Sequence, residues 1–255
     1  TTFRGGLSYP IVRATGGTLT AAVGANAIQA FSRSGDSDNF VDEVRSVDAS
    51  LTFTESGFLS GATRLSLGVE KSLSVLGATN QNDDFPQSRF DGDPWATRFV
   101  FDFVRAQRLY GEFSALFQKV GQYSAEGLPS SEEVAIGGAR FGRAFDSGEV
   151  AGDHGLAGSI ELRYVFRDQT SWLIEVEPYG FYDQGTIWNI EEPPQEPLSE
   201  TLVSAGAGAR FLVNFGSPDV DISGFIEYAR PLNRPRETED PKYTPRWLSG
   251  FSLRY

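Results

Sequence analysis

The most pervasive feature of the sequence is a strict alternation of apolar residues with polar or small ones. In 98–104, for example, Phe99, Phe101 and Phe103 alternate with charged or aliphatic neighbours. The same period recurs in three further segments, 113–118, 156–164 and 203–213. Because successive side chains of a β-strand point to opposite faces of the sheet, this period predicts strands with one apolar face each. The chain is therefore predicted to be all-β.

About twelve strands are expected, separated by clusters of Gly, Pro, Asp and Asn. They lie near 2–14, 17–34, 40–55, 60–77, 95–109, 111–124, 131–139, 155–166, 170–186, 200–215, 220–231 and 244–255. An even number of strands would let an antiparallel up-and-down sheet close into a barrel. No linker interrupts the pattern, so residues 1–255 are expected to form one domain.

The strands and their connections favour a transmembrane barrel over a soluble β-sandwich, which is the alternative. The alternating segments reach about ten residues, whereas strands of globular proteins usually have about 5–6. Long polar connections alternate with tight turns such as 15–17 and 166–168; the long ones are 34–39, 79–94, 191–200 and 234–243. Long loops on one side and short turns on the other are typical of outer-membrane barrels, whose apolar faces contact lipid.

Composition narrows the possible partners and chemistry. A formal net charge of -12 argues against a nucleic-acid partner, because phosphates are bound by basic surfaces. Cysteine is absent, so neither a disulfide framework nor a thiolate metal site is possible. Outer-membrane lipid remains the expected surrounding of the apolar faces.

Candidate catalytic and metal-binding residues are few. The single histidine, His154, lies in a Gly-Asp-His-Gly turn and is expected to be a solvent-exposed loop residue. Asp146, Glu149 and Asp153 lie close together in sequence, but their spacing fits no EF-hand, and they are expected to be polar loop residues. We therefore expect no enzymatic activity, no cofactor and no metal.

The most specific stretch is 121–164, in which several short motifs follow one another. They are Leu128-Pro129, Glu132, Gly137-Gly138, Arg143-Ala144-Phe145, Gly152-Asp153-His154-Gly155 and Glu161-Leu162-Arg163. In this order they resemble the TpsB-type transporters of two-partner secretion, the haemolysin and filamentous-haemagglutinin exporters. The resemblance covers most of the chain. It implies a pore in the outer membrane of a Gram-negative bacterium that secretes a large unfolded exoprotein, the TpsA-type cargo.

A second motif lies on the next predicted strand, where Phe181, Asp183 and Gly185 are similar to the family's Phe-x-Asp-x-Gly. The resemblance implies that a loop folds back into the lumen as a lid and that its arginine, Arg143, is held by Asp183. The implied loop motif consists of Gly137, Gly138, Gly142, Arg143, Ala144 and Phe145. Ala144 stands where the family usually has glycine. Either the tip does not need glycine there, or its flexibility has moved to Gly142.

The alternation independently places Asp183 on the lumen side of its strand. Glu175 and Glu177 share its face, and carboxylates facing lipid would be unfavourable. A paired role in glycoside hydrolysis is the less plausible reading of these two glutamates. The predicted lumen-lining residues are Glu161, Arg163, Glu175 and Glu177.

The last strand carries Phe251, Leu253 and Tyr255 on its predicted outward face. An aromatic end of this kind resembles the signal that the outer-membrane barrel-assembly machinery reads. That machinery is therefore an expected partner, besides the exoprotein and lipid.

Family members combine a sixteen-stranded barrel with two periplasmic POTRA domains and a plug helix. If 131–139 corresponds to the eleventh family strand, then 2–14 is the fifth, and four strands and the periplasmic part would lie outside this sequence. A shortened barrel of about twelve strands is the alternative. The functional alternatives are a barrel-assembly insertase of the same superfamily and a passive solute porin.

Overall fold

The computed structural model describes nine parts of the chain. They are residues 1–34, 37–78, 88–89, 92–93, 95–167, 173–190, 198–214, 221–233 and 244–254. Most of the predicted long connections lie outside these residues, as does Tyr255. Within the described residues no helix is long and apolar enough to cross a membrane.

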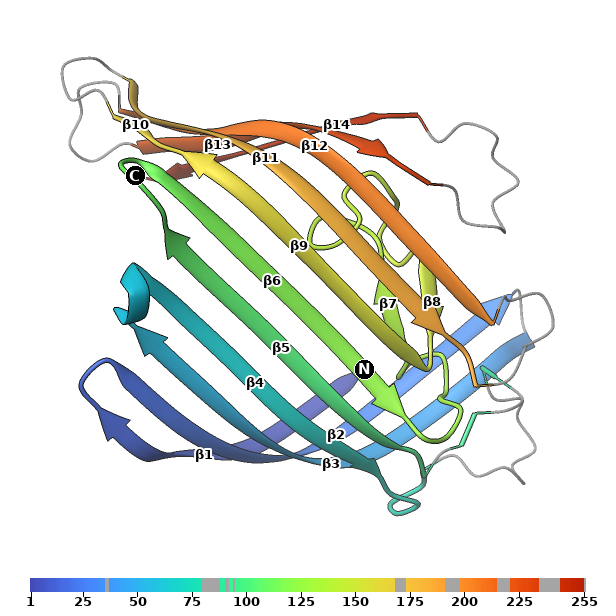
Figure 1. Cartoon of the computed structure of the whole chain (residues 1–255). Coiled ribbons are helices and arrows are strands. Elements are labelled where there is room, and N and C mark those ends of the chain that lie inside the picture. The colour runs from blue at the N-terminus through green and yellow to red at the C-terminus, as the bar shows by residue number, and fades with distance from the viewer. Residues whose placement is uncertain are drawn as a thin grey trace.

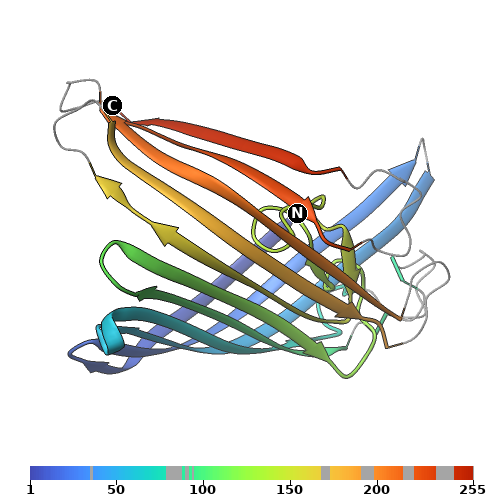
Figure 2. The same cartoon turned by 45° about the horizontal axis from the view of Figure 1, so that its top comes forward.

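One antiparallel sheet of twelve strands forms most of the molecule. In spatial order it consists of β1 (Thr2–Ala14), β2 (Gly17–Ser34), β3 (Ser37–Ser56), β4 (Gly61–Ser72), β5 (Thr97–Arg108), β6 (Phe113–Ser124), β9 (His154–Tyr164), β11 (Leu173–Trp188), β12 (Ser199–Asn214), β13 (Asp221–Pro231) and β14 (Arg246–Arg254). The short strand β10 (Phe166–Arg167) pairs with β11 alone. Figures 1 and 2 show the sheet curving into a wide trough. The predicted up-and-down antiparallel architecture is confirmed. In the described part of the chain, β1 and β14 are not paired, so the sheet is not closed.

One predicted strand is wrong. The segment 131–139 does not enter the wall; β7 (Val134–Ile136) pairs only with β8 (Val150–Gly152), in a separate two-stranded sheet. Its apolar run has three residues and ends at Gly137, whereas a strand needs about 9–11 residues to cross a membrane. In the wall, β6 pairs directly with β9. The proposed correspondence of 131–139 with a family barrel strand therefore fails, and so does the count of strands that depends on it.

The residues between β6 and β9, 125–153, form what we call the inner loop. They carry β7 and β8 and lie on the concave side of the sheet, as both views show. The loop enters from the end of the sheet that also holds the connections β4–β5 and β11–β12. The opposite end holds the turn between β1 and β2 and the 3-10 turn η1 (Phe58–Ser60) between β3 and β4.

The two faces of the sheet differ as the alternation predicts. On the convex face, large apolar side chains such as Phe99, Ile160 and Leu162 are exposed. On the concave face, Ser159 and Glu161 of the same strand β9 are buried beneath the inner loop. Burial of polar rather than apolar residues identifies the concave face as the lumen side of a barrel wall, and the convex face as the lipid side.

Candidate functional site

An apolar cluster fixes the inner loop to the wall. Four buried loop residues, Ile136, Phe141, Ala144 and Phe145, belong to it. From the wall it includes Ala157, Tyr179, Phe181, Ile187, Leu202 and Ala229, which come from β9, β11, β12 and β13. Phe145 is 1% exposed, and burying a side chain of this size contributes about 1.5–3 kcal/mol. The cluster places the intervening residue, Arg143, against the wall.

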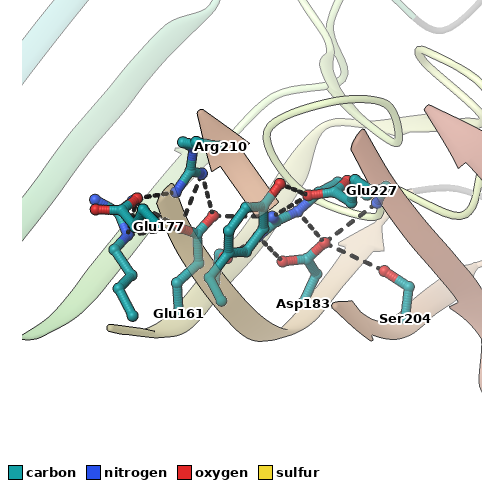
Figure 3. A network of polar contacts seen from close by, with 10 residues as sticks. Glu161, Glu177, Asp183, Ser204, Arg210 and Glu227 are labelled. Atoms are coloured by element: carbon teal, nitrogen blue, oxygen red, sulfur yellow. Dashed lines mark hydrogen bonds and ion pairs between the residues drawn. The ribbon is translucent and has the colours of Figure 1, made fainter. Parts of the chain in front are cut away.

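Arg143 donates hydrogen bonds through all five N–H groups of its guanidinium. Nε and Nη2 donate to the two oxygens of Asp183 at 3.1 and 3.0 Å, which makes a two-bond contact. The second Nη2 hydrogen reaches Ser159 at 2.9 Å. Nη1 donates to Glu161 at 2.8 Å and to Glu227 at 2.9 Å. The planar fork of arginine is therefore fully satisfied. We call these five residues the tip site (Figure 3).

Asp183 is fully buried and accepts more than the arginine side chain. Its Oδ2 also receives the backbone N–H of Arg143 at 3.2 Å and the hydroxyl of Ser204 at 3.2 Å. Phe181, two residues earlier on β11, lies under the guanidinium, with its ring centroid 3.6 Å from Cζ. A cation over an aromatic face gains electrostatic attraction, most when it is shielded from water.

The protonation of Arg143 is secured by its partners. Burial alone would lower its pKa, but the hydrogen bond and charge of Asp183, together with Glu227 and Glu161, raise the pKa above its usual value. The residue therefore stays a cation. Three carboxylates surround the guanidinium, and removing the arginine would take away the cation that pairs with the buried carboxylates of Asp183 and Glu227 and one of several that pair with Glu161.

The network continues along the wall through shared carboxylates. Glu161 also binds Arg163 at 2.6 Å and Arg210 at 3.1 Å, and Arg210 in turn contacts Glu177 at 2.7 Å (Figure 3). Glu175 lies further along β11 and pairs with Arg167 at 3.0 Å, a more exposed contact. The four residues predicted to line the lumen thus all lie on the concave face and in ion pairs. Ionic hydrogen bonds of this kind fix side-chain positions.

Glycines permit the close approach of loop and wall. A Cβ at Gly185 would lie 2.6 Å from Cγ2 of Ile136, so only glycine leaves room for β7 there. In the loop, Gly137, Gly138 and Gly142 adopt φ of +120, +89 and +85°, respectively. Ala144 does not share this conformation, and its methyl group is buried in the apolar cluster. The left-handed backbone at the tip is therefore carried by Gly142, one of the two possibilities left by the sequence.

A second buried charge holds the base of the inner loop, and its burial was not predicted from the sequence. Asp153, expected to be a polar loop residue, is 0% exposed. It accepts hydrogen bonds from Arg89 at 2.7 Å and from the backbone N–H groups of Leu128 and Ile190 at 2.6 and 3.0 Å. His154 is also not a freely exposed side chain. Its Nδ1 accepts the N–H of Ser124 at 3.2 Å, so the expectation of an exposed loop residue is wrong.

The structure describes two of the three residues of the predicted assembly signal, which stays a prediction. Phe251 and Leu253 are exposed, whereas Arg246 of the same strand contacts the inner loop at Asp146. The two apolar residues therefore lie on the lipid side, which is the position that recognition from outside the wall requires. Tyr255 lies outside the described residues.

Comparison with known proteins now adds to this geometry. The sequence profile of the family described as haemolysin secretion/activation protein ShlB/FhaC/HecB matches residues 3–211. The chain belongs to this family. The predicted resemblance to TpsB-type transporters is thereby confirmed, and proteins of the ShlB/FhaC/HecB family lie in the outer membrane of Gram-negative bacteria. No protein with a curated description matches the sequence.

Solved structures show the same fold at low sequence identity. CdiB from Escherichia coli superposes with a TM-score of 0.80 and 19% identity over 99% of this chain and 45% of that one. CdiB from Acinetobacter baumannii gives 0.70 and 17%, over 99% and 41%. BamA from Haemophilus ducreyi lacking POTRA domains 1–3 gives 0.57 and 13%, over 98% and 53%. This ShlB/FhaC/HecB chain thus spans less than half the length of the CdiB proteins that it resembles in fold.

Proposed function

We propose that the chain forms the wall and the inner loop of an outer-membrane pore that exports a large unfolded exoprotein by two-partner secretion. The observation that carries the proposal is the inner loop, whose tip is bound to the middle of the wall through Arg143 and Asp183. A loop in this place obstructs the lumen. Family membership supports a secretion role.

In the proposed mechanism, the exoprotein enters unfolded from the periplasm and passes along the polar concave face in an extended form. The inner loop acts as a lid and Arg143 as its latch, with Asp183 as the receiving group on the wall. Transport then requires the tip to leave its site or to shift along it. Folding of the cargo outside the cell prevents its return and supplies the driving force.

The test compares Arg143→Ala and Asp183→Ala in the protein expressed in its own outer membrane. Each variant breaks the buried two-bond contact between Arg143 and Asp183, and breaking a buried ion pair costs about 3–5 kcal/mol. We expect export to fall by about tenfold or more, since a factor of ten corresponds to about 1.4 kcal/mol. Exoprotein in the medium is measured relative to the amount of folded barrel in the membrane.

A matched control is Arg140→Ala in the same loop. Arg140 pairs with Asp102 at 2.5 Å, but its side chain is 51% exposed. Export should remain near the level of the unmodified protein. Undiminished export by both tip-site variants would rule out the latch.

A barrel-assembly insertase is the second candidate, favoured by the fold shared with BamA at a TM-score of 0.57. Depletion of the protein distinguishes the two functions. An insertase predicts a general loss of other barrels from the outer membrane. An exporter predicts the loss of its exoprotein from the medium while the other barrels persist. An open solute porin fits less well, because its lumen would need to be free of the inner loop.

A further inference from the structure

We infer that Asp153 and Arg89 form a second closure of the pore, at the base of the inner loop and separate from the tip site. Opening the pore would require Ser88 and Arg89, which lie between β4 and β5, to part from the inner loop at this ion pair. The inference rests on the proposed function, because it assigns a position in the transport cycle to these residues. It makes them positioning residues for transport.

The hydrogen bonds at Asp153 join three connections that are far apart in sequence. Arg89 belongs to the β4–β5 connection, Leu128 to the inner loop, and Ile190 to the connection that follows β11. Asp153 itself lies directly before β9. Two connections from different hairpins are thus fastened to the inner loop by a single carboxylate.

The charged groups of this site are shielded from water. The side chain of Arg89 is 5% exposed and that of Asp153 is 0% exposed. Arg89 also donates to Glu133 at 2.8 Å and to the carbonyl oxygen of Leu128 at 3.2 Å. Without the guanidinium, the buried carboxylates of Glu133 and Asp153 would lie near one another with no cation between them. In a water-poor setting such groups favour separation of the segments that carry them, which would expose both to solvent.

A second set of contacts fastens the same segments. Ser88, next to Arg89, donates its backbone N–H to Asp42 of β3 at 3.0 Å and accepts the N–H of Ser130 at 2.9 Å. Asp93 donates its N–H to the carbonyl oxygen of Gly127 at 2.7 Å. The β4–β5 connection therefore bridges the wall and the base of the loop. We call Arg89, Leu128, Glu133, Asp153 and Ile190 the base site.

The base site lies at the end of the sheet where the loop enters, whereas the tip site lies further inside. β11 shows this spacing directly: Asp183 of the tip site is within the strand, and Ile190 follows its last residue, Trp188. The two sites share no residue. A chain passing through the lumen would have to pass both, so release of the tip alone would leave the end of the pore covered.

The decisive experiment locks the base site with a disulfide. The chain has no cysteine, and the backbone N–H of Ser130 donates to the hydroxyl of Ser88 at 2.9 Å, so the two residues are direct neighbours. Ser88→Cys combined with Ser130→Cys is introduced in the protein in its own outer membrane, and bond formation is followed by gel mobility. Oxidised protein should stop exporting, and reduction should restore export. Normal export by fully oxidised protein would overturn the inference.

The complementary variant is Arg89→Met, which keeps the length of the side chain but removes its charge. Because the tip site would still close the pore, Arg89→Met is combined with Arg143→Ala. In cells without the exoprotein, uptake of a membrane-impermeant dye by the double variant should rise several-fold relative to Arg143→Ala alone. Arg140→Met, at the exposed pair of the same loop, should leave uptake unchanged. Equal uptake by Arg143→Ala with and without Arg89→Met would also overturn the inference.

These readouts separate failure of the closure from failure of the proposed function. Dye uptake does not depend on any exported protein. If the unmodified chain exports nothing, the secretion role fails while dye uptake still tests the base site. If export is normal and the disulfide does not affect it, the secretion role stands and the second closure is wrong.

Discussion

The two ends of the inner loop are held by opposite arrangements of charge. At the tip, a cation from the loop enters a ring of carboxylates on three wall strands, with Asp183, Glu161 and Glu227 as its members. At the base, the anion Asp153 receives an arginine and two backbone N–H groups from connections. The wall strands are fixed by their hydrogen-bond ladders, so the tip site has a preset geometry. The base site is only as rigid as the connections that build it.

The largest effect is expected from a substitution that disrupts the tip site and leaves the base site intact. Arg143→Ala should weaken docking of the inner loop by about 3–5 kcal/mol, because the buried carboxylates of Asp183 and Glu227 lose the cation that pairs with them. Limited proteolysis of the assembled protein measures docking, since a released loop is cleaved faster. Cleavage at the unmodified rate would show that the apolar cluster around Phe145 holds the loop without the arginine.

Arg143→Lys sharpens this result, since it keeps the charge and removes the planar fork. Lysine donates three hydrogens from one atom, compared with five from three atoms in arginine. Protection from proteolysis should therefore be intermediate. Full protection in the lysine variant would mean that charge alone, rather than the geometry of the guanidinium, holds the tip.

A smaller effect is expected from filling the gap that Gly185 leaves. Gly185→Val would place a side chain against Ile136, 2.6 Å from the new Cβ, and overpacking of this kind costs about 1–3 kcal/mol. The loop should become more accessible to protease although every charge remains. Gly180→Ala on the same strand is the control, because the nearest atom to its Cβ is 3.9 Å away. Equal behaviour of the two variants would refute close packing at Gly185.

The smallest effect concerns the exposed pair between Arg140 and Asp102. Exposed ion pairs contribute about 0–1 kcal/mol, since water screens them and flexible side chains lose entropy. Asp102→Ala should therefore leave loop docking within that range, as measured by the same proteolysis. A loss as large as that of Arg143→Ala would mean that burial does not separate strong from weak contacts in this loop.

The wall could be predicted from sequence because its signal is local. The period of two marks which side chains share a face, and this assigns Glu177 and Asp183 to the concave side of β11 without knowledge of their partners. The local nature of this signal also explains why 131–139 was wrongly predicted to be a wall strand. The run around Val134 alternates like a strand, and its length is the only local sign that it does not belong to the wall.

The partners of the tip and base could not be derived in the same way. Glu227 lies within the predicted strand 220–231, but its approach to Arg143 depends on the register of neighbouring strands, which the period does not determine. Arg89 and Asp153 are separated by 64 positions in the chain. Their contact joins two connections whose paths carry no periodic signal, so a lone aspartate in a turn gave no indication of its burial. The family resemblance implied a role for Arg143 and Asp183. Leu128 and Asp153 of the base site also stand in the family motifs, but the resemblance implied no contact between them and Arg89.

The position of Glu227 in the chain has a consequence for biogenesis. It follows Arg143 by 84 residues and lies on β13, the strand before the last one described. The full set of contacts around the arginine can form only after β9, β11 and β13 have all taken their places in the sheet. Complete docking of the inner loop therefore requires all three strands. We expect a barrel whose C-terminal strands are not yet in place to hold its loop less firmly, so that protease resistance of the loop would report that this side of the wall is complete.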